Sequence, residues 1–316
     1  MSTNTGDIAS PSGDAAERDV VNAHKPFPKG RVAAWVVTLA IAAYFAWSVA
    51  NNENFGWHVV GQYFFDPVVI SGLYVSLGLT VVAMAIGIVL GLLLAVARLS
   101  KDTLASSLAS LFIWFFRGTP LLVQLIFWYN LSTLFPTLSI GIPFGPTFVS
   151  WDTNSVISPM TAAIAGLALN EAAYMAEIIR GGLLSVDKGQ FETAEAFGMT
   201  RARALRRIII PQAMRSIVPP TGNQLISMIK ATSLVSVIAM ADLLYSVQSI
   251  YNRTFEVVPM LLVAVIWYLL ITSVLNIGQS YIERHYSRSD RRSGAAKPAA
   301  KDNSAPALVP AQEAGQ

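Results

Sequence analysis

The chain has 316 residues, of which 53% are apolar and only 13% are charged. An average soluble domain carries about 25% charged residues, so this composition argues against a water-soluble protein. Eight charged residues lie within residues 1–31, ten within 283–316 and ten within Arg180–Arg215, which leaves long apolar runs elsewhere. This distribution indicates a membrane protein with several spans.

Cysteine is absent, and the three histidines are isolated residues outside the apolar runs. The sequence therefore excludes a disulfide framework, a Cys-ligated metal and a thiol nucleophile, and it leaves no histidine cluster for a metal site or a catalytic triad. It also has no Gly-x-Ser-x-Gly or His-Glu-x-x-His motif, which argues against an integral-membrane enzyme.

About 20 apolar residues in a helix cross a hydrocarbon core about 30 Å thick. By this measure we count six spans, which in chain order are Val32–Ala50, Ile70–Ala97, Leu108–Leu134, Ser158–Ile179, Ile217–Leu244 and Val257–Ile277. The third is interrupted at Arg117–Pro120. The terminal segments 1–31 and 286–316 lack periodicity and are rich in small and polar residues, so we expect disordered tails there.

The first span could in principle be a cleaved signal peptide, because Ser48, Val49 and Ala50 resemble a small-residue cleavage site. Its apolar run is longer than the usual 7–15 residues, and a polar lead of 31 residues precedes it. We therefore favour a retained transmembrane helix over residues 32–51.

Orientation follows from lysine and arginine, because loops rich in these residues stay cytoplasmic. With the N-terminus inside, 19 of the 22 lie on the inner side, and the outer loops contain only Arg253. We expect a multi-pass protein of the bacterial cytoplasmic (inner) membrane with both termini cytoplasmic.

The segment 185–215 carries most of the charge between the tails. Ser185 or Asp187 can cap a short helix that begins near Lys188. Phe191, Ala194 and Phe197 recur at a spacing of three residues, which predicts one apolar stripe on that helix.

Gly198 fits the position after the last helical turn, where a positive φ is usual. Thr200 can cap a second, basic helix, which we expect to be interrupted at Pro211. The segment is thus predicted to form a helix–glycine–helix elbow on the cytoplasmic face, suited to gripping by a soluble partner.

This elbow resembles the EAA loop of ABC importer permeases, whose pattern is Glu-Ala-Ala-x3-Gly-x9-Ile-x-Leu-Pro. The matching positions are Glu192, Thr193, Ala194, Gly198, Ile208, Ile210 and Pro211, with Thr193 and Ile210 as mild departures. Further stretches resemble the polar amino-acid branch of these permeases, namely Arg117–Gln124, Ala173–Gly181, Pro219–Gln224 and Lys230–Leu234. The resemblance covers residues 65–285.

The resemblance implies an all-α polytopic membrane protein of the type I ABC importer permease fold, with five core transmembrane helices plus one N-terminal helix. The first helix of the elbow would be the coupling helix, seated in a groove of a cytoplasmic ATPase. The implied coupling residues are Phe191, Glu192, Thr193, Ala194, Phe197, Gly198 and Pro211.

Polar residues inside the spans are candidates for the substrate pathway, because buried polar groups in a membrane are usually functional or paired. The candidates are Arg117, Thr119, Asn170, Glu171, Lys230, Thr232 and Ser233. The Arg117 guanidinium would either satisfy carbonyls freed at the break or recognise a substrate carboxylate. Glu171 would either bind a substrate ammonium group or pair with Arg117 or Lys230.

Many relatives carry aspartate at the position of Ala231. This chain lacks that carboxylate, so the resemblance does not imply a contact to a basic amino acid here. That difference favours a polar substrate other than arginine or lysine.

No Walker A sequence occurs in the chain, so the energy would come from a separate ATPase in two copies, which would bind the ATP and magnesium. This chain itself would have no cofactor and no enzymatic activity. The resemblance also implies a second permease subunit, identical or related, and an extracytoplasmic amino-acid-binding protein; no nucleic acid is expected. The alternative is a secondary carrier or channel without an ATPase.

Overall fold

The computed structural model describes residues 29–142 and 145–294, and the predicted tails 1–28 and 295–316 lie outside these residues. The chain forms two units, residues 1–55 and 56–316. The first contains α2 (Lys29–Asn51) and a 3₁₀ turn, η1 (Glu53–Phe55). α2 is apolar along its length and none of its residues is buried, as expected of a helix that lipid would cover.

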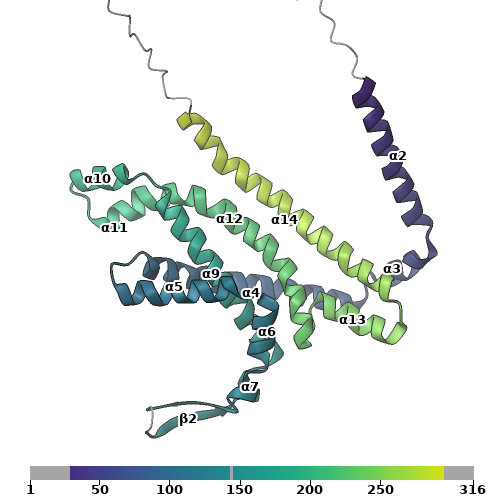
Figure 1. The fold of residues 1–316 in the computed structure, drawn as a ribbon, viewed down its shortest axis with the longest axis horizontal. Coiled ribbons are helices and arrows are strands. Elements are labelled where there is room, and N and C mark those ends of the chain that lie inside the picture. Colours follow the sequence, from purple (N-terminus) through teal and green to yellow (C-terminus); the bar gives the residue numbers. More distant parts are fainter. Residues whose placement is uncertain (1–28, 143–144, 295–316) are drawn as a thin grey trace, which may run out of the picture. The chain divides into compact units, whose positions relative to one another are not determined.

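The second unit is built around the packing of α4 (Pro67–Arg98) on α9 (Pro159–Leu184), after the short α3 (Trp57–Tyr63) (Figure 1). Both helices begin with a proline that follows the N-cap residue, Asp66 or Ser158. A proline is favourable there because it has no amide, and the amides of the first turn have no partner within the helix. Gly87 and Gly91 let the two helices approach closely, because a Cβ at Gly91 would lie 2.6 Å from the Cβ of Met175. This pair of glycines is thus a packing device between the two helices.

Between α4 and α9 the chain makes four helices and a hairpin. α5 (Thr103–Gly118) and α6 (Leu121–Tyr129) meet at 103°, and α7 (Leu131–Leu134) follows. The hairpin consists of β1 (Thr137–Gly141) and β2 (Thr147–Asp152), and α8 (Thr153–Val156) leads into α9. The predicted third span is therefore a sharply bent pair, and the hairpin was not expected from the sequence.

After α9 come the elbow and the last helices. The elbow comprises α10 (Lys188–Ala196), α11 (Arg201–Ala204) and a π-helical segment, η2 (Leu205–Ile209), which runs into α12 (Ile210–Ala231). A 3₁₀ segment, η3 (Thr232–Ile238), separates α12 from α13 (Leu243–Thr254), and the last helix is α14 (Val257–Gly294). The predicted fifth span is thus bent by 46° and the predicted C-terminal tail begins too early, since residues 286–294 are helical.

Pro211 does not interrupt the second helix of the elbow as predicted. The π-helical segment places Pro211 in the first turn of α12, where a missing amide removes no helical hydrogen bond. Pro219 and Pro220 also lie inside α12.

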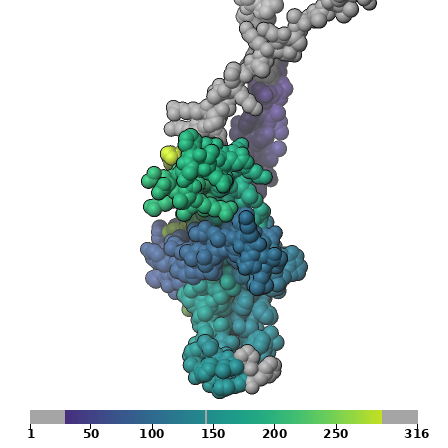
Figure 2. Space-filling view, turned by 90° about the vertical axis from the view of Figure 1, so that its left-hand side faces the viewer, coloured from purple at the N-terminus to yellow at the C-terminus, as the bar shows by residue number. Residues whose placement is uncertain are grey.

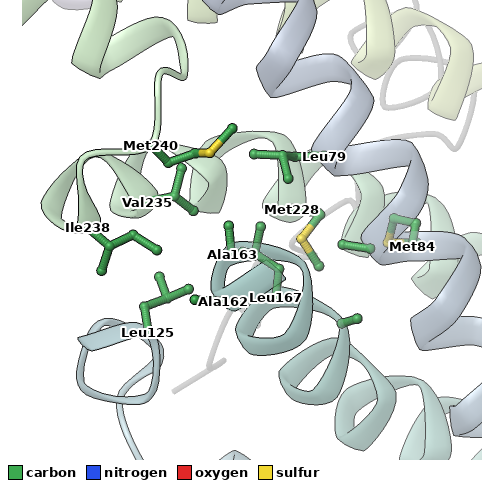
Figure 3. Packing of buried hydrophobic residues seen from close by; sticks show 12 residues of the cluster. Leu79, Met84, Leu125, Ala162, Ala163, Leu167, Met228, Val235, Ile238 and Met240 are labelled. Carbon is green, nitrogen blue, oxygen red and sulfur yellow. The ribbon is translucent and has the colours of Figure 1, made fainter. Parts of the chain in front are cut away.

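The largest buried cluster joins α4, α6, α9, α12 and η3 (Figure 3). Leu125 of α6 and Leu167 of α9 are fully buried there beside Val235 of η3. This cluster fixes the bent α5–α6 pair against α9. Among the described residues, four helices are long and apolar enough to span a membrane, or up to six if each bent pair is counted as one span; six were predicted from the sequence.

Candidate functional site

The α10–α11 elbow is held in shape by caps at both ends of α10. At its start the amide of Gly189 donates to Oδ1 of Asp187 at 2.6 Å. At its end Gly198 has φ +69°, and the amides of Gly198 and Met199 donate to the carbonyls of Glu195 and Ala194 at 2.9 and 3.0 Å. This is the Schellman arrangement, which requires the left-handed conformation that glycine adopts without strain. The sequence predicts Gly198 in its role and offers Ser185 or Asp187 as the first cap; the structure has Asp187 there.

Only part of the predicted apolar stripe of α10 faces the protein. Ala194 is buried and Phe191 is half-buried, but Phe197 is 82% exposed. Phe197 lies at the C-cap, where the backbone has already left the helix, so its side chain leaves the stripe. Glu192 and Thr193 are also exposed. The outer face of α10 therefore presents an aromatic, a carboxylate and a hydroxyl group.

The base of the elbow packs on the rest of the unit. Ile209 and Ala213 are fully buried with Val186, and Phe191 packs against this cluster from α10. Ser185 Oγ donates to Ser216 Oγ at 2.9 Å. The elbow is thus joined to the ends of both α9 and α12, and Figure 2 shows it as the green upper part of the unit. Pro211 is exposed at this base.

A second candidate region lies at the α5–α6 break. Nε2 of Gln124 lies 3.0 Å from the carbonyl oxygen of Phe116 and 2.7 Å from Oγ1 of Thr119. Nδ2 of Asn170 donates to the same Phe116 carbonyl at 2.9 Å. The Phe116 carbonyl at the break is therefore satisfied by Gln124 and Asn170, so the alternative in which Arg117 does this is wrong for that carbonyl. The Arg117 guanidinium is exposed and lies 5.4 Å from the ring centre of Tyr174.

Glu171 is 4% exposed, and its Oε1 has no hydrogen-bond partner within the described part of the chain. It faces Gly87 of α4, because a Cβ at Gly87 would lie 2.7 Å from Cγ of Glu171. Of the two alternatives for Glu171, pairing with Arg117 or Lys230 is not found among the described residues, where the ion pair joins Glu177 and Arg180 at 2.6 Å.

The remaining pathway candidates lie at the end of α12. Lys230 is exposed, whereas Thr232 is buried and its Oγ1 donates to the carbonyl of Ile229 at 2.7 Å. Ser233 Oγ donates to the Lys230 carbonyl at 2.7 Å. Thr119 and Asn170 thus share one cluster with Gln124, whereas Glu171 points to α4 and the two hydroxyls bond within their own turns.

Gln124 and Asp242 are among the buried polar residues that were not predicted from the sequence. Gln124 donates a hydrogen bond to the Phe116 carbonyl at the α5–α6 break. Its position at the end of the motif Arg117–Gln124 could have indicated this role from the sequence. Asp242 is fully buried and accepts hydrogen bonds from the amides of Leu244 and Tyr245 at 3.1 and 2.9 Å. An aspartate inside the predicted fifth span marked this position, because carboxylates inside a membrane are rare.

Comparison with known proteins agrees with this architecture. Residues 87–288 match the family described as binding-protein-dependent transport system inner membrane component, and the chain belongs to this family. It is the membrane-spanning permease subunit of an amino acid ABC importer.

The chain is 42% identical to the arginine transport system permease protein ArgU of Corynebacterium glutamicum, over 95% of this chain and 94% of that protein. It is 36% identical to the glutamine transport system permease protein GlnP of Escherichia coli K12, over 69% and 92% of the two chains. A crystal structure of an amino acid ABC transporter with histidines matches at TM-score 0.61 and 37% identity, covering 71% of this chain and 97% of that one. The type I permease fold predicted from the elbow motif agrees with these matches.

Proposed function

We propose that this chain forms one half of an amino-acid translocation pathway and is driven by a cytoplasmic ATPase that grips the α10–α11 elbow. Two ATPase copies would bind the ATP and magnesium, and a second permease subunit, identical or related, would complete the pathway. An extracytoplasmic amino-acid-binding protein would deliver the substrate. The chain would lie in the bacterial inner membrane with both termini cytoplasmic.

The exposed elbow is the observation that carries this proposal. Glu192 and Thr193 of the capped helix α10 are exposed, and so is Phe197 at its C-cap. Nothing lies within 4 Å of where a Cβ at Gly198 would stand, so a partner could approach the backbone closely at this turn. The elbow and the β1–β2 hairpin lie at opposite ends of the unit (Figures 1 and 2), as expected if they face opposite sides of a membrane.

Movement of the elbow would be passed to the spans through its packed base. The buried contacts of Ile209 and Ala213 connect it to α12, and Ser185 connects it to the end of α9. A Cβ at Gly182 of α9 would overlap the side chain of Ile217, so these two helices are in close contact. ATP-driven approach of two elbows would therefore tilt α9 and α12 as rigid bodies between inward- and outward-open states.

The substrate pathway would run beside α9, where Thr119 and Asn170 line the break and Glu171 is buried, with no partner for its Oε1 among the described residues. The exposed cations Arg117 and Lys230 would attract a substrate carboxylate. The substrate would be a polar amino acid. Identity to ArgU makes arginine the first ligand to test, whereas the sequence argument from Ala231 points away from it.

The elbow is tested by two substitutions at Gly198 in a complex reconstituted with its ATPase. We expect Gly198→Val to abolish ATP-driven uptake and to leave membrane insertion intact. The valine side chain would block the close approach of the ATPase, and its backbone would be strained at φ +69°. Asparagine tolerates positive φ, so Gly198→Asn adds bulk with little strain. If close approach matters, uptake is lost in both variants, and full uptake by Gly198→Val would contradict the coupling role.

A further inference from the structure

The β1–β2 hairpin has two chemically different faces. In its register Leu138 lies opposite Trp151 and Ile140 opposite Val149. Thr137 lies opposite Asp152 and Ser139 opposite Ser150. Because directly opposed residues of an antiparallel pair share a face, the first two pairs form an apolar face and the last two form a polar face.

Three of the four side chains of the apolar face are exposed in the described part of the chain, and Leu138 is half-buried. Ile140 is 62%, Val149 47% and Trp151 44% exposed. The hairpin is attached at its base, where the amide of Thr153 donates to the Pro136 carbonyl at 3.0 Å and its hydroxyl donates to the carbonyl of Phe135. An isolated two-stranded hairpin is marginal in water, so a hairpin with a bare apolar face needs a cover.

The charge pattern shows which cover fits. No charged residue occurs from Gly118 to Trp151, and the first carboxylate, Asp152, lies on the polar face. Docking surfaces for soluble proteins have a polar rim around their apolar centre, and this face has no charged rim of its own. Segments that contact lipid, in contrast, avoid charge.

Backbone hydrogen bonding limits the depth of the hairpin. Among the described residues each strand pairs with the other alone, so the outer edge of each leaves backbone amides and carbonyls without a strand partner there. Such groups are not tolerated in hydrocarbon, but water among lipid headgroups can satisfy them. Tryptophan is also enriched at this level of the bilayer. The headgroup–acyl boundary therefore suits the edges, Trp151 and the apolar face together.

The segments that precede the hairpin in the chain also expose apolar side chains, which indicates that the hairpin lies beside this boundary. α6 has exposed apolar residues, including Val123 and Phe127, and the series continues through Leu134 and Phe135 at the foot of β1. From these observations we infer that the face formed by Leu138, Ile140, Val149 and Trp151 rests on the lipid surface. The hairpin is then an interfacial membrane anchor next to α6 and α9, a role separate from energy coupling.

The absence of cysteine allows a direct test. Ile140→Cys and Val149→Cys report on the apolar face, and Ser139→Cys and Ser150→Cys are matched controls on the polar face. Each full-length variant is labelled with bimane and placed in nanodiscs of phosphatidylethanolamine and phosphatidylglycerol. Fluorescence is then quenched with doxyl-labelled lipid or with aqueous iodide.

We expect doxyl lipid to quench the labels at 140 and 149 at least threefold more than those at 139 and 150, and iodide to show the reverse order. A second variant pair keeps the 140 label and adds Val149→Asp or Ser150→Asp; only the first is expected to lower quenching by doxyl lipid. Iodide quenching at all four positions without lipid quenching would overturn the inference, because the face would then stand in water. Protection of positions 140 and 149 from both quenchers would also overturn it, because a second protein surface would then be the cover.

Discussion

Asn170 of α9 donates a hydrogen bond to the Phe116 carbonyl at the end of α5, across 54 residues of sequence and a distance of 2.9 Å. The same amide nitrogen lies 3.3 Å from Oε1 of Gln124 in α6. One side chain thus holds both arms of the bent α5–α6 pair against the central helix. These two arms meet at 103°, with Pro120 between them.

Removing this amide is expected to loosen the bend. Asn170→Ala leaves the Phe116 carbonyl with Gln124 alone and should reduce stability by about 1 kcal/mol, the usual contribution of one hydrogen bond. Thermal unfolding in detergent measures the change. Asn130→Ala is the control, since the Asn130 amide is exposed and bonds within its own helical turn. Equal melting temperatures for the two variants would count against the bridging role.

The close contact of α4 and α9 gives a second prediction. Gly91→Ala should destabilise the protein by about 1–3 kcal/mol, because the new methyl group would lie 2.6 Å from Cβ of Met175 and 3.0 Å from the Ala172 carbonyl. Gly78→Ala in the same helix meets nothing within 4 Å and should be neutral or mildly stabilising. The melting temperatures of the two variants test this difference. If Gly91→Ala melted at the wild-type temperature, the close contact of α4 and α9 would not contribute to stability.

Replacing the buried carboxylate of Glu171 is expected to lower uptake without lowering stability. Glu171→Gln keeps the shape of the side chain and removes a carboxylate whose Oε1 has no partner in the described structure, so stability should stay equal or rise. If the carboxylate receives the ammonium group of the substrate, uptake should fall about tenfold or more, as expected for one lost charged contact. Uptake and thermal unfolding are measured on the same preparation. Unchanged uptake would remove Glu171 from the pathway.

Asp242 should be more important for stability than an ordinary helix cap. Asp242→Ala removes two buried hydrogen bonds to backbone amides and a third from the Tyr268 hydroxyl at 3.3 Å, so a loss of about 2–3 kcal/mol is expected. Asp102→Ala removes an exposed cap of α5 with one amide bond and should lose about 1 kcal/mol or less. Unfolding midpoints of the two variants test this order.

The elbow could be predicted from the sequence because its determinants are local. Asp187, Gly198 and the spacing between them define the caps of α10 with no information from distant residues. Spans could be located because apolar length alone indicates them. Local pattern also explains the error at Phe197, since a spacing of three residues does not reveal that the helix has ended at this residue.

Tertiary contacts were beyond the reach of sequence patterns. The partner of the Phe116 carbonyl lies 54 residues away, so Arg117, the nearest polar residue, was a reasonable but wrong choice. The same holds for Glu171, which faces a glycine on α4 rather than a cation. The register of the hairpin needs its turn geometry, which the run of Gly and Pro residues between the strands does not specify.

Uptake into proteoliposomes tests the central claim most directly. The permease is reconstituted with or without its ATPase subunit, a radiolabelled amino acid and the binding protein are supplied at the binding-protein face, and ATP is supplied at the elbow face. We expect accumulation only when the ATPase and ATP are both present, and its loss with Gly198→Val. Accumulation by the permease alone, driven by an ion gradient, would contradict the account and establish a secondary carrier instead.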